Sequence, residues 1–206
     1  MEQNAKKLGF GLMRLPLTDP NNGASVDVEL LKTMVDAFLE KGFTYFDTAY
    51  VYHGGFSEVA FRKAVVKRYP RDAYTITTKL PLFSKPDRAG MEKIFAESME
   101  RLGVDYIDYY WLHAMGKDSY EHAQKVDAFG YLKELKEAGK IKHIGFSFHD
   151  GPEMLEKILT EHPEVEYVQL QINYLDWEDG WVRARRCYEV ATKYGKPVIV
   201  MEPVRG

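Results

Sequence analysis

The chain has 206 residues and a formal net charge of −3, with 45% hydrophobic and 29% charged residues. This composition is typical of a globular protein with one sizeable core, and the absence of clustered positive charge argues against a nucleic-acid partner. No apolar run is long enough to span a bilayer, and the first residues, MEQNAKK, lack an apolar signal core, so we expect no membrane partner. The single cysteine, Cys187, excludes an internal disulfide and is expected to pack within a helix, which favours the reducing cytoplasm.

Short apolar runs alternate along the chain with longer segments of helical periodicity. Seven strands are predicted, at residues 8–13, 43–47, 74–80, 106–113, 141–147, 167–172 and 197–202. Six helices are predicted between them, at residues 28–42, 57–69, 87–103, 131–139, 152–162 and 182–195.

The ends of these helices carry recognisable signals. Ser57 and Asp87 are expected to cap the second and third helices, Gly42 and Gly103 to end the first and third, and Pro152 suits a first helical turn. The first helix also shows one apolar stripe at helical spacing, formed by Leu30, Leu31, Met34, Val35, Phe38 and Leu39.

Strict alternation of strand and helix predicts an α/β protein with parallel strands joined by helical crossovers. Two architectures fit, a (β/α) barrel and an open doubly wound sheet. The dinucleotide-binding form of the second requires G-x-G-x-x-G after its first strand, whereas GFGLMR here has no third glycine and no helix start. Without a linker or low-complexity run, residues 1–206 are expected to form one domain.

Unusual polar residues stand where the predicted strands end. Asp47 ends the second strand and Tyr52 follows it, while Lys79 and His113 end the third and fourth. A parallel barrel gathers its chemistry at these carboxyl ends, so the four side chains are expected to share one mouth. Each has a structural alternative: Asp47 as a cap or salt-bridge partner, Tyr52 in surface packing, Lys79 in solvent and His113 as a core residue.

The four residue types together form a chemical unit. An ammonium near a tyrosine stabilises the phenolate and so helps the phenol to give up its proton. A carboxylate keeps that ammonium charged and oriented, and a histidine can either donate a hydrogen bond to a carbonyl oxygen or share the proton of the tyrosine. His53, His122 and His162 are expected to be solvated, and because no two histidines are spaced four apart on a helix, no metal site is predicted.

At these residues the sequence resembles the aldo-keto reductase superfamily. FDTAYVY is similar to its D-T-A-x-x-Y signature, TKL supplies the lysine, and DYYWLHAM is similar to its D-x-x-x-L-H strand. The resemblance implies a (β/α)8 TIM-type barrel, a general acid at Tyr52, a lysine at Lys79 that tunes it, Asp47 that orients the lysine, and His113 that positions a carbonyl.

The same resemblance implies a nicotinamide cofactor, NADP(H), with NAD(H) as the other candidate, and a small-molecule carbonyl substrate. Its expected contacts are at Met13, Arg14, Asp47, Ser147, Gln169 and Met201. The sequence departs from the pattern of many members in two places, with Met201 where an aromatic ring stacks on the nicotinamide and Phe148 where an asparagine follows the strand-five serine. GFSFHD, QLQINYLDW and VMEPVRG resemble a prokaryotic branch often followed by an iron–sulfur segment, but no iron–sulfur cluster is expected in this chain.

The leading functional prediction is therefore an NAD(P)H-dependent oxidoreductase that reduces aldehydes or ketones. Two alternatives stay open at this point, a non-catalytic cofactor-sensing regulatory subunit and an inactive barrel fragment. Because seven strands are visible and such barrels have eight, we expect a barrel truncated after its seventh strand, incomplete at the C-terminus. Its unpaired strand edges are expected to favour self-association.

Overall fold

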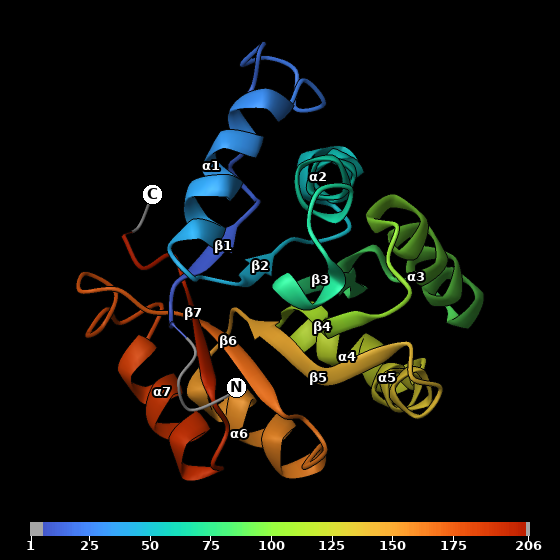
Figure 1. Cartoon of the computed structure of the whole chain (residues 1–206). Helices are drawn as coiled ribbons and strands as arrows, with labels where there is room; N and C mark the ends of the chain where they lie inside the picture. The colour runs from blue at the N-terminus through green and yellow to red at the C-terminus, as the bar shows by residue number, and fades with distance from the viewer. Residues whose placement is uncertain (1–5, 205–206) are drawn as a thin grey trace. The chain divides into compact units, whose positions relative to one another are not determined.

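The computed structural model describes residues 6–204, in which strands and helices alternate along the chain (Figure 1). The strands are β1 Gly9–Gly11, β2 Tyr45–Asp47, β3 Thr75–Pro81, β4 Ile107–Met115, β5 Ile141–Phe148, β6 Tyr167–Gln171 and β7 Val198–Met201. The α-helices are α1 Val28–Glu40, α2 Phe56–Phe61, α3 Arg88–Leu102, α4 Lys117–Lys125, α5 Ala128–Glu137, α6 Pro152–Glu161 and α7 Ala184–Lys193. The expectation about an N-terminal signal core falls partly on residues 1–5, which lie outside the described residues.

The strands form one sheet in which their spatial order follows the chain, β1-β2-β3-β4-β5-β6-β7. The registers of β1 with β2, β2 with β3, β5 with β6 and β6 with β7 are all parallel. A doubly wound sheet would reverse its strand order at a switch point, so the sequential order excludes that alternative and confirms the barrel-type α/β fold. Within the described residues, the seventh strand is the last.

The chain divides into two compact units. The first comprises Met1–Leu80 and Met91–Tyr109, and the second comprises Pro81–Gly90 and Tyr110–Gly206. The first contains β1, β2, most of β3 and most of α3. The second contains most of β4 and everything that follows it.

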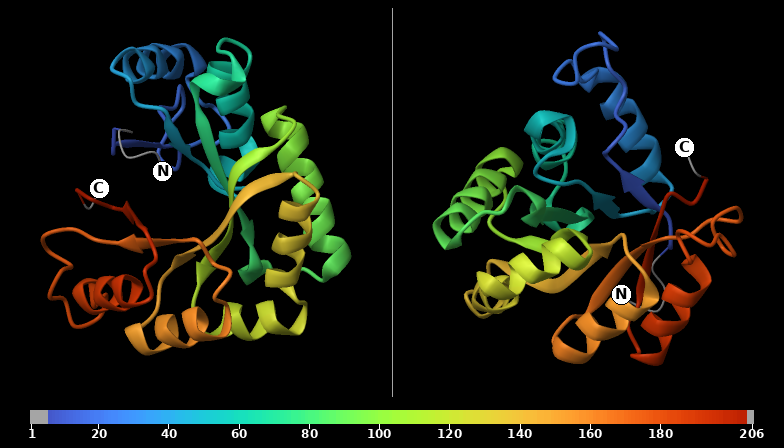
Figure 2. Two further views of the ribbon diagram at one scale, coloured as in Figure 1. Left: turned by 60° about the horizontal axis from the view of Figure 1, so that its bottom comes forward. Right: turned by 180° about the vertical axis from the view of Figure 1, so that it is seen from behind.

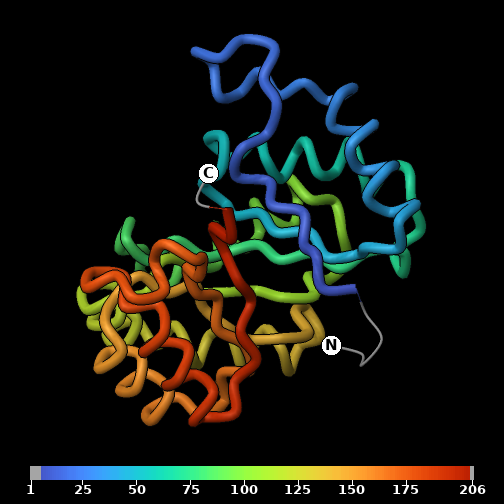
Figure 3. Tube along the Cα trace, turned by 90° about the vertical axis from the view of Figure 1, so that its left-hand side faces the viewer, coloured from blue at the N-terminus to red at the C-terminus, as the bar shows by residue number. Residues whose placement is uncertain are grey.

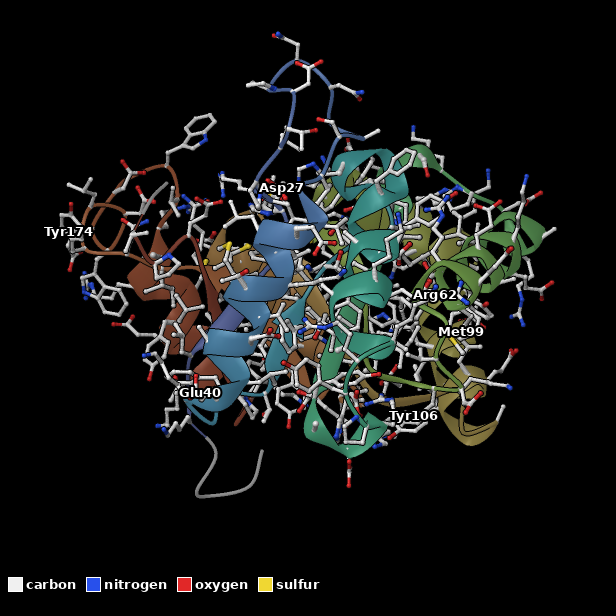
Figure 4. The ribbon with its side chains drawn as sticks, turned by 45° about the horizontal axis from the view of Figure 1, so that its top comes forward. Asp27, Glu40, Arg62, Met99, Tyr106 and Tyr174 are labelled. Carbon is white, nitrogen blue, oxygen red and sulfur yellow. The ribbon has the colours of Figure 1, made fainter. Side chains whose placement is uncertain are left out.

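In the first unit, α1 packs against the first strands of the sheet through aromatic side chains. Asp27 starts this helix by accepting a hydrogen bond from the backbone N–H of Leu30 (2.9 Å), and Figure 4 labels it at one end of α1 and Glu40 at the other. Phe38 packs edge-on against Phe46 of β2, with 5.2 Å between ring centroids.

The predicted apolar stripe of α1 is only partly correct. Leu31, Val35 and Phe38 are buried, whereas Leu30 and Met34 are 48% and 42% exposed. The spacing of apolar residues therefore identified the helix but predicted a wider buried face than the helix has. In the same unit, the chain before α1 forms a loop closed by an antiparallel bridge between Leu17 and Val26, and Figure 3 shows it beyond the start of the helix.

The prediction that Ser57 caps the second helix is wrong. Gly55 is the N-cap of α2, and Ser57 is fully buried inside the helix. After Phe61 the helix continues as a π-helical turn over Arg62–Val66. Arg62, labelled near Met99 in Figure 4, donates from Nη1 to a backbone carbonyl of α3 at 3.2 Å.

In the second unit, β5, β6 and β7 lie side by side, and α6 and α7 pack next to each other against them (Figures 1 and 2). Cys187 is buried in α7, as predicted, and its thiol donates to the backbone carbonyl of Asp150 at 3.7 Å. Helix α4 was not predicted. Its sequence KDSYEHAQK contains few apolar residues, and it buries only short polar or small side chains besides Tyr120.

The prediction that three histidines are solvated is also wrong. His53 Nε2 accepts a hydrogen bond from the backbone N–H of Leu15 (3.1 Å), and His122 Nε2 donates to the carbonyl of Pro86 (2.8 Å). The side chain of His162 is only 19% exposed. No group of three or more histidine, cysteine, aspartate or glutamate side chains within residues 6–204 is arranged to hold a metal ion. None of the helices in that range has both the length and the apolar content needed to cross a membrane.

Candidate active site

The first unit brings together three of the four residues predicted at the strand ends. Lys79 Nζ donates to Asp47 Oδ1 at 2.5 Å, to the backbone carbonyl of Thr48 at 2.8 Å and to the hydroxyl oxygen of Tyr52 at 3.4 Å. The ammonium therefore uses its three N–H groups on a carboxylate, a carbonyl and a phenol. Because the phenol oxygen accepts from the ammonium, the proton of Tyr52 must point away from Lys79.

Lys79 is a charged side chain without exposed surface. Its side chain is 0% exposed, and the side chain of Asp47 is 13% exposed. Burial is the largest single influence and lowers the pKa of a lysine, but the charges and hydrogen bonds of Asp47 and Tyr52 together outweigh it, and the pKa of Lys79 is raised. The ammonium therefore stays charged beside Tyr52 throughout the neutral pH range.

Tyr45 also contacts this group, although the sequence did not single it out. Its hydroxyl donates to Asp47 Oδ2 at 3.2 Å and accepts from Thr77 Oγ1 at 2.8 Å. Burial of the hydroxyl and the charge of Asp47 raise the pKa of Tyr45 well above its ordinary range, so it stays protonated. Tyr45 stands two residues before Asp47 on a strand, and that spacing is the signal that could have identified it, because alternate residues share a face.

A chain of buried hydroxyls joins the end of β2 to α2. Thr48 Oγ1 and Ser57 Oγ lie 2.7 Å apart, and Ser57 Oγ donates to the carbonyl of Leu12 at 2.9 Å. This is the role that Ser57 has in place of a helix cap. Met13 and Arg14, predicted to border a cofactor, directly follow Leu12, and both are exposed.

His113, in the second unit, is near the end of β4. Its side chain is largely buried, and its ring packs against Phe83 with 5.6 Å between centroids. The next residue, Ala114, has a φ of 53°, a left-handed conformation that non-glycine residues rarely adopt. Ser147 Oγ accepts a hydrogen bond from the Ala114 N–H at 2.8 Å, which holds the backbone next to the histidine.

Ser147 and Gln169 are paired in the register of β5 and β6. Both side chains are buried, with 1% and 5% exposure. Since Ser147 Oγ accepts from the Ala114 N–H, its own hydroxyl proton is directed elsewhere. The pair thus offers a hydroxyl donor and an amide, the groups that a carboxamide requires, and these residues fit the nicotinamide expected from the sequence.

Polar side chains at and just beyond the end of β6 hold the loop that follows it. Gln171 Nε2 and Asn173 Nδ2 donate to Asp176 Oδ2 at 2.7 Å and 2.6 Å, and Asp176 is 2% exposed. Met201 stands opposite Gln171 in the register of β6 with β7. Gln171 and Asn173 therefore serve the loop structure.

A pocket of about 560 Å³ opens in the second unit between β5, β6 and α7. Its apolar lining includes Phe148, Leu170 and Cys187. Successive residues of a strand point to opposite faces, so Phe148 and Leu170 lie on the face opposite Ser147 and Gln169. None of the predicted cofactor residues is among its lining residues, although Gln171, which shares a strand face with Gln169, is.

The sequence-predicted residues accordingly fall into two groups. The first unit holds Lys79 in contact with both Asp47 and Tyr52, with Met13 and Arg14 on the loop after β1. The second unit holds the others, which are His113, Ser147, Gln169 and Met201.

Comparisons with known proteins agree on one family for this chain. The model described as the Aldo/keto reductase family matches residues 7–206. An aldo-keto reductase from Mycolicibacterium smegmatis is 35% identical over 149 residues, which are 71% of this chain and 49% of that protein. The NADH-specific methylglyoxal reductase of Escherichia coli is 30% identical over 162 residues, which are 69% of this chain and 48% of that protein. The chain spans about half the length of these curated relatives.

Solved structures show the same fold. The holo form of an aldo-keto reductase from Bacillus halodurans superposes with a TM-score of 0.71 at 25% identity, covering 98% of this chain and 63% of that chain. An aldo-keto reductase from Klebsiella pneumoniae in complex with NADPH superposes with a TM-score of 0.67 at 20% identity, covering 94% of this chain and 62% of that chain.

Proposed function

We propose that this chain, which belongs to the Aldo/keto reductase family, reduces aldehyde or ketone carbonyls with a hydride from NAD(P)H. The observation that carries the proposal is the contact of the buried Lys79 ammonium with both Asp47 and Tyr52. A positive charge beside a phenol stabilises the phenolate that remains after proton transfer. Tyr52 is therefore proposed as the proton donor to the carbonyl oxygen.

Each of the other groups has a proposed part in the same reaction. Asp47 keeps Lys79 charged and oriented, and Tyr45 holds the second oxygen of that carboxylate. His113 is proposed to donate a hydrogen bond to the substrate carbonyl, which fixes the oxygen near the phenol.

Ser147 and Gln169 are proposed to bind the carboxamide of the nicotinamide, and Met13, Arg14 and Met201 to border the cofactor. When bound, the cofactor supplies the hydride. Both nicotinamide cofactors are kept in the proposal, because one relative is named NADH-specific and one structural neighbour was solved with NADPH. We further propose that the chain acts in the cytoplasm, in line with its single buried thiol.

The proposal is tested by following NAD(P)H oxidation with methylglyoxal and 4-nitrobenzaldehyde as probes. We expect oxidation only when a carbonyl is present, with one alcohol formed for each NAD(P)H consumed. Asp47→Asn removes the charge that holds Lys79 and should lower the rate by about tenfold or more. The matched control is Asp36→Asn. Asp36 lies on α1 and forms an ion pair with Arg68 at 2.7 Å, so this variant also loses a paired carboxylate but should leave the rate unchanged.

Equal rates for the two variants would contradict the proposed role of Asp47. Carbonyl-independent oxidation, or none at all, would contradict the proposed function.

A further inference from the structure

Arg101, on α3, contacts the chain on both sides of Tyr52. Its Nη1 donates to the backbone carbonyl of Tyr50 at 3.2 Å, and the same nitrogen lies 3.4 Å from Glu58 Oε2. Tyr50 precedes Tyr52 by two residues, and Glu58 follows it by six. One guanidinium therefore connects the two flanks of the segment that carries the proposed proton donor.

Tyr50 is held at its ring and hydroxyl as well. The guanidinium carbon of Arg101 lies 4.3 Å from the centroid of the Tyr50 ring. The Tyr50 hydroxyl donates to Glu97 Oε2 at 2.5 Å, and Arg101 Nη2 donates to the same oxygen at 3.3 Å. A planar fork of several N–H groups can make these contacts together, which a single ammonium cannot.

The close approach of Arg101 depends on a glycine. Gly55 has a φ of 93°, and a Cβ atom at this position would lie 2.6 Å from Arg101 Nη1. The two residues before it, His53 and Gly54, also have positive φ values, of 52° and 62°. Glycine adopts this conformation readily, but His53 carries a Cβ atom, so contacts from outside the segment help to hold its backbone in place.

Glu58 extends these contacts to the strand that carries Lys79. Its side chain is 0% exposed, and Thr78 Oγ1 donates to Glu58 Oε1 at 2.7 Å. Thr78 is the residue before Lys79. Arg101 thus reaches, through one buried carboxylate, the side-chain hydroxyl of the residue that precedes Lys79 on β3.

We propose that Arg101 is a positioning residue that fixes Tyr52 against Lys79. The inference rests on the proposed function of Tyr52 as proton donor. The distance from Lys79 Nζ to the Tyr52 oxygen is 3.4 Å, the longest of the three ammonium contacts, so a small displacement of the segment would break it. Displacements of about 1 Å in a catalytic group can lower the rate by about a hundredfold.

The test compares Arg101→Met with Arg71→Met in the whole chain. Arg71 pairs with Asp108 at 2.5 Å, and its side chain is 25% exposed against 26% for Arg101. The pair lies at the opposite, amino end of β3, where Asp108 accepts from the N–H of Ile76. The control variant thus loses an equivalent ion pair without touching the Tyr52 segment.

Two readouts are measured for each variant. The first is hydrogen–deuterium exchange of the peptide covering residues 48–56, which requires no activity. The second is the set of three constants kcat, KM for methylglyoxal and Kd for NADPH, each measured separately to show which of them the substitution changes. We expect Arg101→Met to raise exchange in that peptide and to lower kcat by about tenfold or more while the Kd of NADPH stays within about twofold. Arg71→Met should change neither readout, and Arg101→Lys should restore part of kcat.

Unchanged exchange at residues 48–56 in Arg101→Met, or an equal fall of kcat in both variants, would overturn the inference. If Arg101→Met does not fold, Arg101→Lys is judged by the same two readouts, and wild-type exchange and kcat in that variant would overturn it. If the wild-type chain reduces no carbonyl, the proposed function fails, and the exchange measurement alone decides whether Arg101 holds the segment.

Discussion

Lys79 and Asp47 form an ion pair between neighbouring strands, with 2.5 Å between Nζ and Oδ1 and no exposed surface on the lysine side chain. In the register of β2 with β3, Asp47 stands opposite Thr77, and Lys79 lies two residues further along the same face. The lysine therefore extends beyond the end of β2, where the segment carrying Tyr52 begins. This relationship places a permanent positive charge at the phenol and underlies the predictions below.

Replacing Lys79 by Met should lower the rate of carbonyl reduction and shift its pH dependence. Methionine is similar in length to the lysine stem but carries no charge, so the phenolate of the acid loses its stabilisation. The apparent pKa of the acid in the pH–rate profile should rise. A profile whose basic limb is the same in variant and wild type would remove Lys79 from the proposed mechanism.

Gln169→Ala and Ser147→Ala should weaken binding of NADPH. Each lost hydrogen bond is worth about 0.5–1.5 kcal/mol, which corresponds to a Kd raised about two- to tenfold. Ser147→Ala also removes the acceptor for the Ala114 N–H, so only this variant should disturb the backbone beside His113. Fluorescence titration with NADPH gives the Kd, and unfolding in urea gives the stability. Unaltered Kd values in both variants would contradict the cofactor assignment.

The stability of the chain should depend on pH through Glu58. Burial raises the pKa of Glu58 above its ordinary value of 4.5, although the hydrogen bond from Thr78 and the charge of Arg101 act in the opposite direction. The folded state therefore binds this proton more tightly than the unfolded state. The resulting stabilisation is complete below pH 4.5 and is lost as the pH rises through the folded-state pKa.

Glu58→Gln removes this titration. The difference in unfolding free energy between wild type and variant should change with pH above 4.5, in favour of the variant, by about 1.4 kcal/mol for each unit by which the pKa is raised. Urea unfolding across the acidic range measures it. Two parallel stability curves would show that Glu58 has the same pKa in both states.

The chain should self-associate at high concentration. Within the described residues, β7 ends the order of the sheet, and its Val200 is 46% exposed. Unpaired strand edges favour association, and a lysine on such an edge opposes it. Val200→Lys should therefore shift size-exclusion elution toward the monomer, whereas Leu30→Lys, at a 48% exposed position on α1, should not. A wild-type chain that elutes as a monomer at every concentration would contradict the prediction.

Much of the fold could be predicted from the sequence because its signals are local. The alternation of apolar strands with periodic helices gave the order of the elements, and Gly103 ends α3 with a φ of 67°, as predicted. Helix α4 was not predicted, since its sequence KDSYEHAQK is largely polar and shows no clear apolar stripe.

Part of the candidate site could also be predicted from the sequence. Asp47, Tyr52 and Lys79 belong to short motifs at strand ends, so their grouping could be anticipated. The contributions of Glu58 and Arg101 could not, because they depend on contacts between residues distant in the sequence. Arg101, for example, donates to the carbonyl of Tyr50, and the two residues are 51 positions apart in the sequence. Tyr45 was overlooked, although its place two residues before Asp47 is a local signal.

The measurement that tests the central claim most directly is a single turnover with Tyr52→Phe. The variant and wild type are saturated with NADPH, mixed with methylglyoxal, and followed by the loss of NADPH absorbance. The matched control is Tyr188→Phe, at a 43% exposed position on α7. If Tyr52 donates the proton, Tyr52→Phe slows the turnover by about a hundredfold or more, its Kd for NADPH is unchanged, and Tyr188→Phe behaves as wild type. A Tyr52→Phe variant that keeps more than about a tenth of the wild-type rate would contradict the account.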